Sequence, residues 1–114
     1  MLVDEPLYQV DVERRLDLLG DRLMNEVERF AVLIVERAEA ESDYKRRYHR
    51  ALLQQSAGTV AQREAMAQLK TADQFRSWKI VEAQEKATQQ ALIALRTQIE
   101  ATRTISANVR AAGG

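Results

Sequence analysis

Five basic side chains lie within six residues near the middle of this 114-residue chain. They are Lys45, Arg46, Arg47, His49 and Arg50. Ammonium and guanidinium groups at this density can neutralise and hydrogen-bond several phosphates at once. The cluster therefore predicts contact with a polyanion. The residue types alone leave open whether that polyanion is a nucleic acid or an acidic protein.

A helix-stop signal and a helix-start signal follow the basic cluster. Gly58 predicts a left-handed backbone just past a helix end, a conformation that glycine adopts without steric cost. Thr59 predicts an N-cap, and Gln62 three residues later completes a capping box. We therefore expect the basic cluster at the tip of a helical hairpin.

Long helices must position this tip, because one Pro, four Gly and no Cys in 114 residues are typical of an all-α protein. We predict a long antiparallel helical hairpin, similar to a coiled coil, preceded by a short helical arm. Gly20 either bends or ends the helix of that arm. The expected parts are an acidic N-terminal arm (1–20), a hairpin (21–112) made of a helix (21–56), a turn (57–59) and a helix (60–110), and a flexible tail (113–114).

Two further basic residues, Arg63 and Lys70, follow the turn at a spacing of two helical turns. Antiparallel pairing of the helices would bring them near Arg46, Arg47 and Arg50, with Glu64 as a nearby acid. The predicted nucleic-acid-binding residues are Lys45, Arg46, Arg47, Arg50, Arg63 and Lys70.

An apolar stripe on the first hairpin helix is expected to face the second helix. Its members are Leu23, Val27, Phe30, Ile34, Ala38, Tyr44, Tyr48 and Leu52. We therefore expect Tyr44 and Tyr48 to pack in the core rather than to stack on bases. Val32 and Val35 lie off the stripe, and a second subunit or the N-terminal arm must cover them.

The second hairpin helix also carries more apolar surface than one hairpin can bury. One seam has the alternating three- and four-residue spacing of a coiled coil: Leu92, Leu95, Ile99, Thr102, Ser106 and Val109. Another face carries mostly alanine. We therefore predict a homo-oligomer, with an interface formed by Val32, Val35, Leu92, Leu95, Ile99 and Val109.

The net charge of zero conceals an asymmetry along the chain. Residues 1–43 carry twelve acids against five arginines, and residues 44–114 carry twelve basic residues against five acids. Such a division indicates an anionic partner, contacts between subunits, or two oppositely charged helix surfaces lying beside each other.

The other residues predict neither an enzyme nor a metal or cofactor site. The single histidine, His49, lies among cations, and the sequence contains no glycine-rich phosphate loop and no nucleophile elbow. The longest apolar run, residues 30–35, is too short to cross a bilayer. The first residues lack the pattern of a signal peptide, and we expect a cytoplasmic protein.

Two segments carry a resemblance to small helical proteins of tailed phages, AEAESDYKRRYHRALLQQSAGTVAQREAMAQLKTAD and ALRTQIEATRTISANVRAA. Their layout is similar to that of the UvsY-type phage recombination mediators. The resemblance implies a ring-forming protein of the host cytoplasm that binds single-stranded DNA and helps to load a recombinase over single-strand-binding protein. In that family a Lys/Arg segment before the hairpin turn contacts DNA, and Lys45, Arg46, Arg47 and Arg50 occupy that place here.

Two classes of function remain open at this point. One is a recombination accessory protein that binds single-stranded DNA. The other is a coiled-coil structural or interaction protein without DNA binding, such as a virion component, an assembly chaperone or an inhibitor of a host protein.

Overall fold

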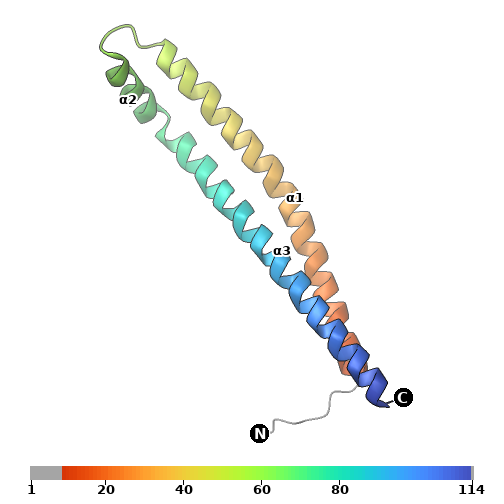
Figure 1. The fold of residues 1–114 in the computed structure, drawn as a ribbon. Coiled ribbons are helices and arrows are strands. Elements are labelled where there is room, and N and C mark those ends of the chain that lie inside the picture. Colours follow the sequence, from red (N-terminus) through yellow and green to blue (C-terminus); the bar gives the residue numbers. More distant parts are fainter. Residues whose placement is uncertain (1–8, 114) are drawn as a thin grey trace. The chain divides into compact units, whose positions relative to one another are not determined.

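The computed structural model describes residues 9–113, which form three α-helices and no strand (Figure 1). Helix α1 spans Gln9–Leu53, α2 spans Val60–Lys70 and α3 spans Ala72–Gly113. The predicted all-α class is therefore confirmed. The first eight residues of the predicted N-terminal arm lie outside the described residues.

Helix α1 continues through Gly20, so residues 9–20 do not form the separate short helix that we predicted. A glycine inside a helix costs roughly 0.5–1 kcal/mol relative to alanine. Val12 and Leu19, on the same helix, are both buried, and burying each such side chain contributes about 1.5–3 kcal/mol. The free energy gained by burying Val12 and Leu19 therefore exceeds the cost of placing Gly20 inside the helix. Helix α1 ends at Leu53, three residues before the predicted end.

The connection between α1 and α2 has the chemistry that the sequence predicts. Gly58 has a φ of +97°, and a Cβ atom there would lie 2.8 Å from Oε1 of Gln62. The hydroxyl of Thr59 accepts a hydrogen bond from the Gln62 amide at 3.1 Å, and the Thr59 amide donates to Gln62 Oε1 at 3.0 Å. The capping box is confirmed. Gly58, however, lies five residues beyond the end of α1, because residues 54–57 belong to the connection.

The predicted second hairpin helix is interrupted at Thr71, which separates α2 from α3. The Thr71 hydroxyl donates a 2.7 Å hydrogen bond to the carbonyl oxygen of Ala67, and its backbone amide bonds to the carbonyls of Ala67 and Gln68. Thr71 has φ −116° and ψ 16°, outside the helical range. This hydroxyl bond alone does not break a helix, because Thr97, Thr102 and Thr104 make the same bond within α3. The backbone angles of Thr71 separate the two helices, and apolar periodicity does not reveal them.

The chain divides into two compact units that do not follow the predicted boundary at residue 20. Unit 1 combines Met1–Arg29 with Thr88–Gly114, and unit 2 is Phe30–Ala87. Helices α1 and α3 each contribute to both units, whereas α2 belongs to unit 2 alone. The predicted basic tip therefore lies entirely in unit 2.

The core of unit 1 is a seam of aliphatic and hydroxyl side chains. Its buried members are Val12, Leu19, Thr88, Leu92, Ile99, Thr102 and Ser106. Gln9 Nε2 donates a 3.1 Å hydrogen bond to Ser106 Oγ, which links α1 to α3. Leu92 and Ile99 are already covered within one chain, and Leu95 and Val109 are partly covered. Leu92 and Ile99 therefore have little surface left for the predicted subunit interface, whereas for Leu95 and Val109 that interface stays a prediction.

The core of unit 2 differs in register from the predicted stripe. Leu33 is buried and Arg37 is half-buried, whereas the expected core residues Ile34 and Ala38 are exposed. The residues of α1 that are covered recur mainly at alternating three- and four-residue steps, so the stripe lies one position earlier here than we predicted. Val32 and Val35 are each 55% exposed, which agrees with their predicted place off the stripe.

Candidate nucleic-acid interface

The basic cluster lies near the C-terminal end of α1, in unit 2. Lys45, Arg46 and Arg47 each expose more than half of the side chain to solvent, and His49 and Arg50 are also exposed. Tyr48 lies between these residues in sequence but is partly buried, with its ring centroid 5.6 Å from that of His49. The cations therefore form an accessible surface, and the tyrosine anchors the helix that carries them.

Three cations of the cluster form ion pairs with acids one turn earlier on α1. Lys45 Nζ lies 2.8 Å from Glu41 Oε2, while Arg46 Nη2 and Arg47 Nε both lie 3.0 Å from the same oxygen of Asp43. Glu64 was the acid predicted near these cations, whereas Glu41 and Asp43 are the ones that pair with them. The spacing of Glu41 and Asp43 by three and four residues from these cations was the signal that could have revealed the pairs.

These contacts stabilise the ionised carboxylates. A hydrogen bond from Arg47, assisted by Arg46, holds the pKa of Asp43 below its ordinary value. A hydrogen bond from Lys45 is the largest cause that lowers the pKa of Glu41, with a smaller contribution from Arg37. Both acids therefore stay charged at neutral pH and offset part of the positive charge of the cluster.

Ion pairs this exposed are weak and can exchange. Surface pairs contribute about 0–1 kcal/mol in general, because water and salt screen them and ordering two long side chains costs entropy. A phosphate can accept the same hydrogen bonds from arginine. The arrangement can thus hold Arg46 and Arg47 in place without anions and release them to a phosphodiester backbone.

The other predicted contact residues are distributed around the turn. Arg50 belongs to the last turn of α1, Arg63 is half-buried on α2, and Lys70 is the exposed last residue of α2. Within residues 9–113, none of the three forms an ion pair. The structure places all six predicted residues in unit 2, but no contact that it records joins Arg63 or Lys70 to Arg46 or Arg47.

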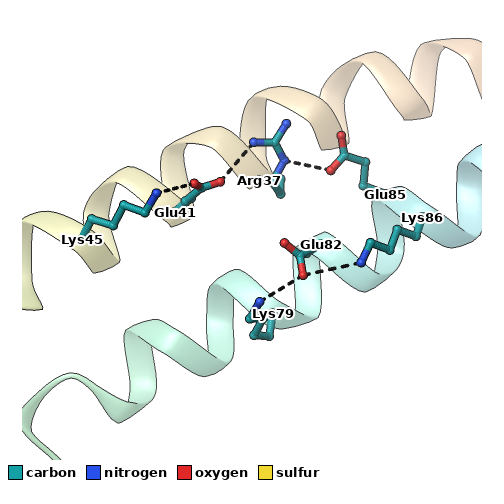
Figure 2. A network of polar contacts seen from close by, with 7 residues as sticks. All are labelled: Arg37, Glu41, Lys45, Lys79, Glu82, Glu85 and Lys86. Atoms are coloured by element: carbon teal, nitrogen blue, oxygen red, sulfur yellow. Dashed lines mark hydrogen bonds and ion pairs between the residues drawn. The ribbon is translucent and has the colours of Figure 1, made fainter. Parts of the chain in front are cut away.

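A charged network continues from the cluster along α1 and onto α3 (Figure 2). Glu41 bridges Lys45 and Arg37, and Arg37 Nε donates a 2.9 Å hydrogen bond across to Glu85 Oε2 on α3. A second group on α3 links Lys79 and Lys86 through Glu82. Lys79 and Lys86, which were not predicted as site residues, therefore belong to the same unit as the basic cluster.

Four aromatic rings gather beside this network, and two of them were missed as site residues. Tyr44 stacks on Trp78 with centroids 5.5 Å apart and meets the edge of Phe75 at 5.3 Å, while Tyr48 lies 5.9 Å from Tyr44. The predicted core role of Tyr44 and Tyr48 agrees with these contacts. Phe75 and Trp78 are three residues apart on α3, and this spacing opposite two tyrosines was the available signal.

No protein-family model, curated protein or solved structure was found to match this chain. Over residues 9–113, no helix is long and apolar enough to cross a membrane. The same residues hold no group of three or more His, Cys, Asp or Glu side chains that could bind a metal ion.

Proposed function

We propose that this protein is an oligomeric single-stranded-DNA-binding accessory protein of the recombination-mediator type. The observation that carries the proposal is the exposed basic cluster at the end of α1, in which Arg46 and Arg47 are held only by solvent-exposed pairs to Asp43. A sequence-tolerant contact with a sugar-phosphate backbone requires cations on an accessible surface and little base-reading apparatus.

The proposal includes an antiparallel hairpin as the element that presents the cluster. In unit 2, Arg37 of α1 pairs with Glu85 of α3, and Tyr44, later in α1, stacks on Trp78, earlier in α3. Contacts that advance along one helix while they recede along the other support antiparallel pairing within this unit. The turn at Gly58 then places Arg50 near the end of the hairpin.

A homo-oligomer is supported by apolar surface that the chain leaves uncovered. Val32 and Val35 remain exposed on α1, and burying a valine contributes about 1.5–3 kcal/mol. Among the described residues only seven apolar side chains are buried, beside four hydroxyl side chains, so the internal core is thin. Several basic tips in one assembly would also raise affinity through high effective concentration.

The role in recombination follows from the resemblance to the UvsY-type mediators described above. It implies a recombinase and a single-strand-binding protein as partners in the host cytoplasm. In this proposal the oligomer holds a single strand on several basic tips while the recombinase replaces the single-strand-binding protein.

Fluorescence anisotropy with a labelled oligothymidine at low salt tests the binding surface. Charge reversal of Arg46, Arg47 and Arg50 to Glu should abolish saturable binding, because the phosphate contacts are lost and replaced by repulsion. Each lost phosphate contact should also reduce the log–log salt slope by about 0.7. The matched control reverses three exposed arginines of α3 (Arg96, Arg103 and Arg110), which changes the net charge equally and should leave most of the binding. Equal losses in the two variants, or no binding by the native oligomer, would contradict the proposal.

Analytical ultracentrifugation tests the assembly. Replacing Val32 and Val35 with Glu should lower the sedimenting mass, since each carboxylate would have to be desolvated at the interface. Val60→Glu, at another exposed valine, is the control and should leave the mass unchanged. A native chain that sediments as a monomer at micromolar concentration would overturn the oligomer.

The alternative is a coiled-coil structural or interaction protein, and one observation favours it. Three of the four predicted Lys and Arg contacts of the basic cluster already have acidic partners, so part of their charge is offset without a nucleic acid. This alternative requires a specific protein partner, and the anisotropy titration would then show no affinity for single strands.

A further inference from the structure

A hollow of about 350 Å³ lies beside the aromatic cluster of unit 2. Its lining comes from all three helices: Tyr44 of α1, Gln68 of α2, and Ala72 and Phe75 of α3. The interruption at Thr71 falls between Gln68 and Ala72, where the chain leaves the regular helix. The hollow is large enough for one planar ring system, and aromatic side chains form part of its wall.

Phe75 gives this hollow an accessible aromatic surface. It is 43% exposed, although it packs edge-on against both Tyr44 and Trp78. Those two contacts fix the orientation of its ring, so a flat ligand would meet a preorganised surface rather than a mobile side chain. Aromatic faces stack on any nucleobase, because every base has a π-face.

One lysine from α1 and one from α3 lie near the rings of Phe75 and Trp78. Lys79 Nζ lies 4.2 Å from the Trp78 centroid and 5.6 Å from the Phe75 centroid, and Lys45 Nζ lies 6.0 Å from Trp78. Lys45 is also a member of the basic cluster. The aromatic surface and the basic cluster are therefore contiguous at this residue, so that a strand whose phosphates contact the cluster would bring its bases close to Phe75.

A polar side chain at the site could form hydrogen bonds with the edge of a nucleobase. The side-chain amide of Gln68 can both donate and accept hydrogen bonds, as the edge of a nucleobase requires. The Nε1 group of Trp78 is buried and has no hydrogen-bond partner within the described residues. Trp78 does not line the hollow, so Gln68 is the polar side chain that the edge of a base would meet there.

We propose that the hollow lined by Tyr44, Gln68 and Phe75 binds one unstacked base of a single DNA strand, with Phe75 as the stacking surface. This inference rests on the proposed function. It adds a contact to the base beyond the contact to phosphate, and it predicts that the protein distinguishes a strand that carries bases from one that lacks them.

Paired titrations with an oligothymidine and an abasic oligonucleotide of equal length and charge test the proposal. Stacking contributes about a 5- to 150-fold gain in affinity per base, and we expect a preference of that order for the oligothymidine. Trp78 is the single tryptophan of the chain, and the oligothymidine, but not the abasic strand, should quench its fluorescence.

Phe75→Leu preserves apolar packing but removes the stacking surface, and it should reduce the preference towards unity while the abasic strand binds as before. Ile80→Ala, which alters another exposed apolar residue of α3, is the control and should retain the preference. Gln68→Ala is a second variant, at another lining residue of the hollow, and it should also lower the preference. It keeps the proposal testable if circular dichroism shows that Phe75→Leu does not fold.

The outcomes separate this inference from the function on which it rests. Equal affinity of the native protein for both strands, or an undiminished preference in Phe75→Leu and Gln68→Ala, overturns the base site and leaves phosphate binding in place. Binding of neither strand overturns both. A preference for bases that disappears in the two variants supports the site.

Discussion

Units 1 and 2 are built from the same two long helices but use different chemistry to hold them together. In unit 1 the covered positions are aliphatic or carry hydroxyl groups, as at Leu92, Ile99 and Thr102. Unit 2 also buries Leu33, Ala51, Ala67 and Thr71, but it adds half-buried contacts of another kind: the ion pair Arg37–Glu85 and the stacked rings of Tyr44 and Trp78. Aliphatic packing resembles an ordinary coiled-coil seam, whereas charges and aromatic rings depart from it.

This difference indicates which unit would carry the proposed binding of a single strand. An ion pair across a helix interface seldom adds stability over an apolar pair, and the exposed ring of Phe75 brings no benefit to a solvated helix. Departures from regular packing are expected at functional sites. Unit 2 contains these departures together with the basic cluster and the interruption at Thr71, so in the proposed function unit 2 is the binding region and unit 1 holds α1 and α3 together.

The largest effect should come from opening the seam of unit 1. Leu92→Ala removes a side chain that is only 6% exposed, and we expect a loss of about 2–4 kcal/mol in the free energy of unfolding. Chemical denaturation followed by circular dichroism measures it. Ile93→Ala changes the neighbouring residue, which is 51% exposed, and should cost less than about 0.5 kcal/mol. Equal losses in the two variants would contradict the seam.

A smaller effect should follow from releasing the arginines of unit 2. Asp43→Asn removes the acceptor shared by Arg46 and Arg47, and we expect the affinity for oligothymidine to rise by roughly two- to tenfold because two weak pairs no longer compete with phosphate. Anisotropy titrations at several salt concentrations measure the change.

Glu39→Gln is the matched control for this prediction. It removes the same charge from an exposed acid on α1 that pairs with no cation within residues 9–113. A general change in net charge would raise the affinity of both variants equally, whereas release of Arg46 and Arg47 would raise it only in Asp43→Asn. No gain in either variant would favour the interaction-protein alternative.

The sequence was sufficient to predict the features that depend on local chemistry. The capping box at Thr59 and Gln62 and the positive φ of Gly58 follow from backbone sterics and a single pair of hydrogen bonds. The exposure of Val32 and Val35 follows from helical periodicity. These features need no knowledge of distant residues.

The errors arise where tertiary contacts outweigh local patterns. The register shift at Leu33 and Arg37 depends on Glu85, which lies 48 residues from Arg37 in the sequence and offers it an ion pair across the helices. An arginine in an apolar stripe is not predicted without that partner. The aromatic cluster was missed for the same reason, because Phe75 and Trp78 gain meaning only when Tyr44 is placed opposite them.

A modest gain in stability should follow from replacing the glycine that lies inside α1 in unit 1. Gly20 lies inside α1, and a Cβ atom added there would meet nothing within 4 Å. Gly20→Ala should therefore raise the free energy of unfolding by about 0.5–1 kcal/mol, mainly by restricting the unfolded chain. Gly58→Ala is the contrasting variant and should destabilise, because its φ is +97° and the new Cβ would crowd Gln62. A loss of stability in Gly20→Ala would show that this position needs glycine.

The smallest effect should be the response of the unit 2 ion pairs to acid. The pKa of Asp43 lies below its ordinary value of 3.8, and that of Glu41 below its ordinary value of 4.5. A carboxylate whose pKa is lowered by folding contributes stability that is fully present above its unfolded pKa and is lost as the pH falls through the folded pKa. We therefore expect this contribution to stay constant from neutral pH to about pH 5 and to decline as the pH falls further, through the ordinary pKa values and then the lowered ones.

Carboxyl carbon chemical shifts in an NMR titration measure these pKa values directly. Because the hydrogen bond from Arg47 is the largest cause of the shift at Asp43, Arg47→Gln should move the pKa of Asp43 upward more than Arg46→Gln does. Equal shifts in the two variants would show that charge alone, rather than the Arg47 hydrogen bond, holds the carboxylate. The accompanying change in stability should be slight, since these side chains are exposed to solvent that screens the pairs.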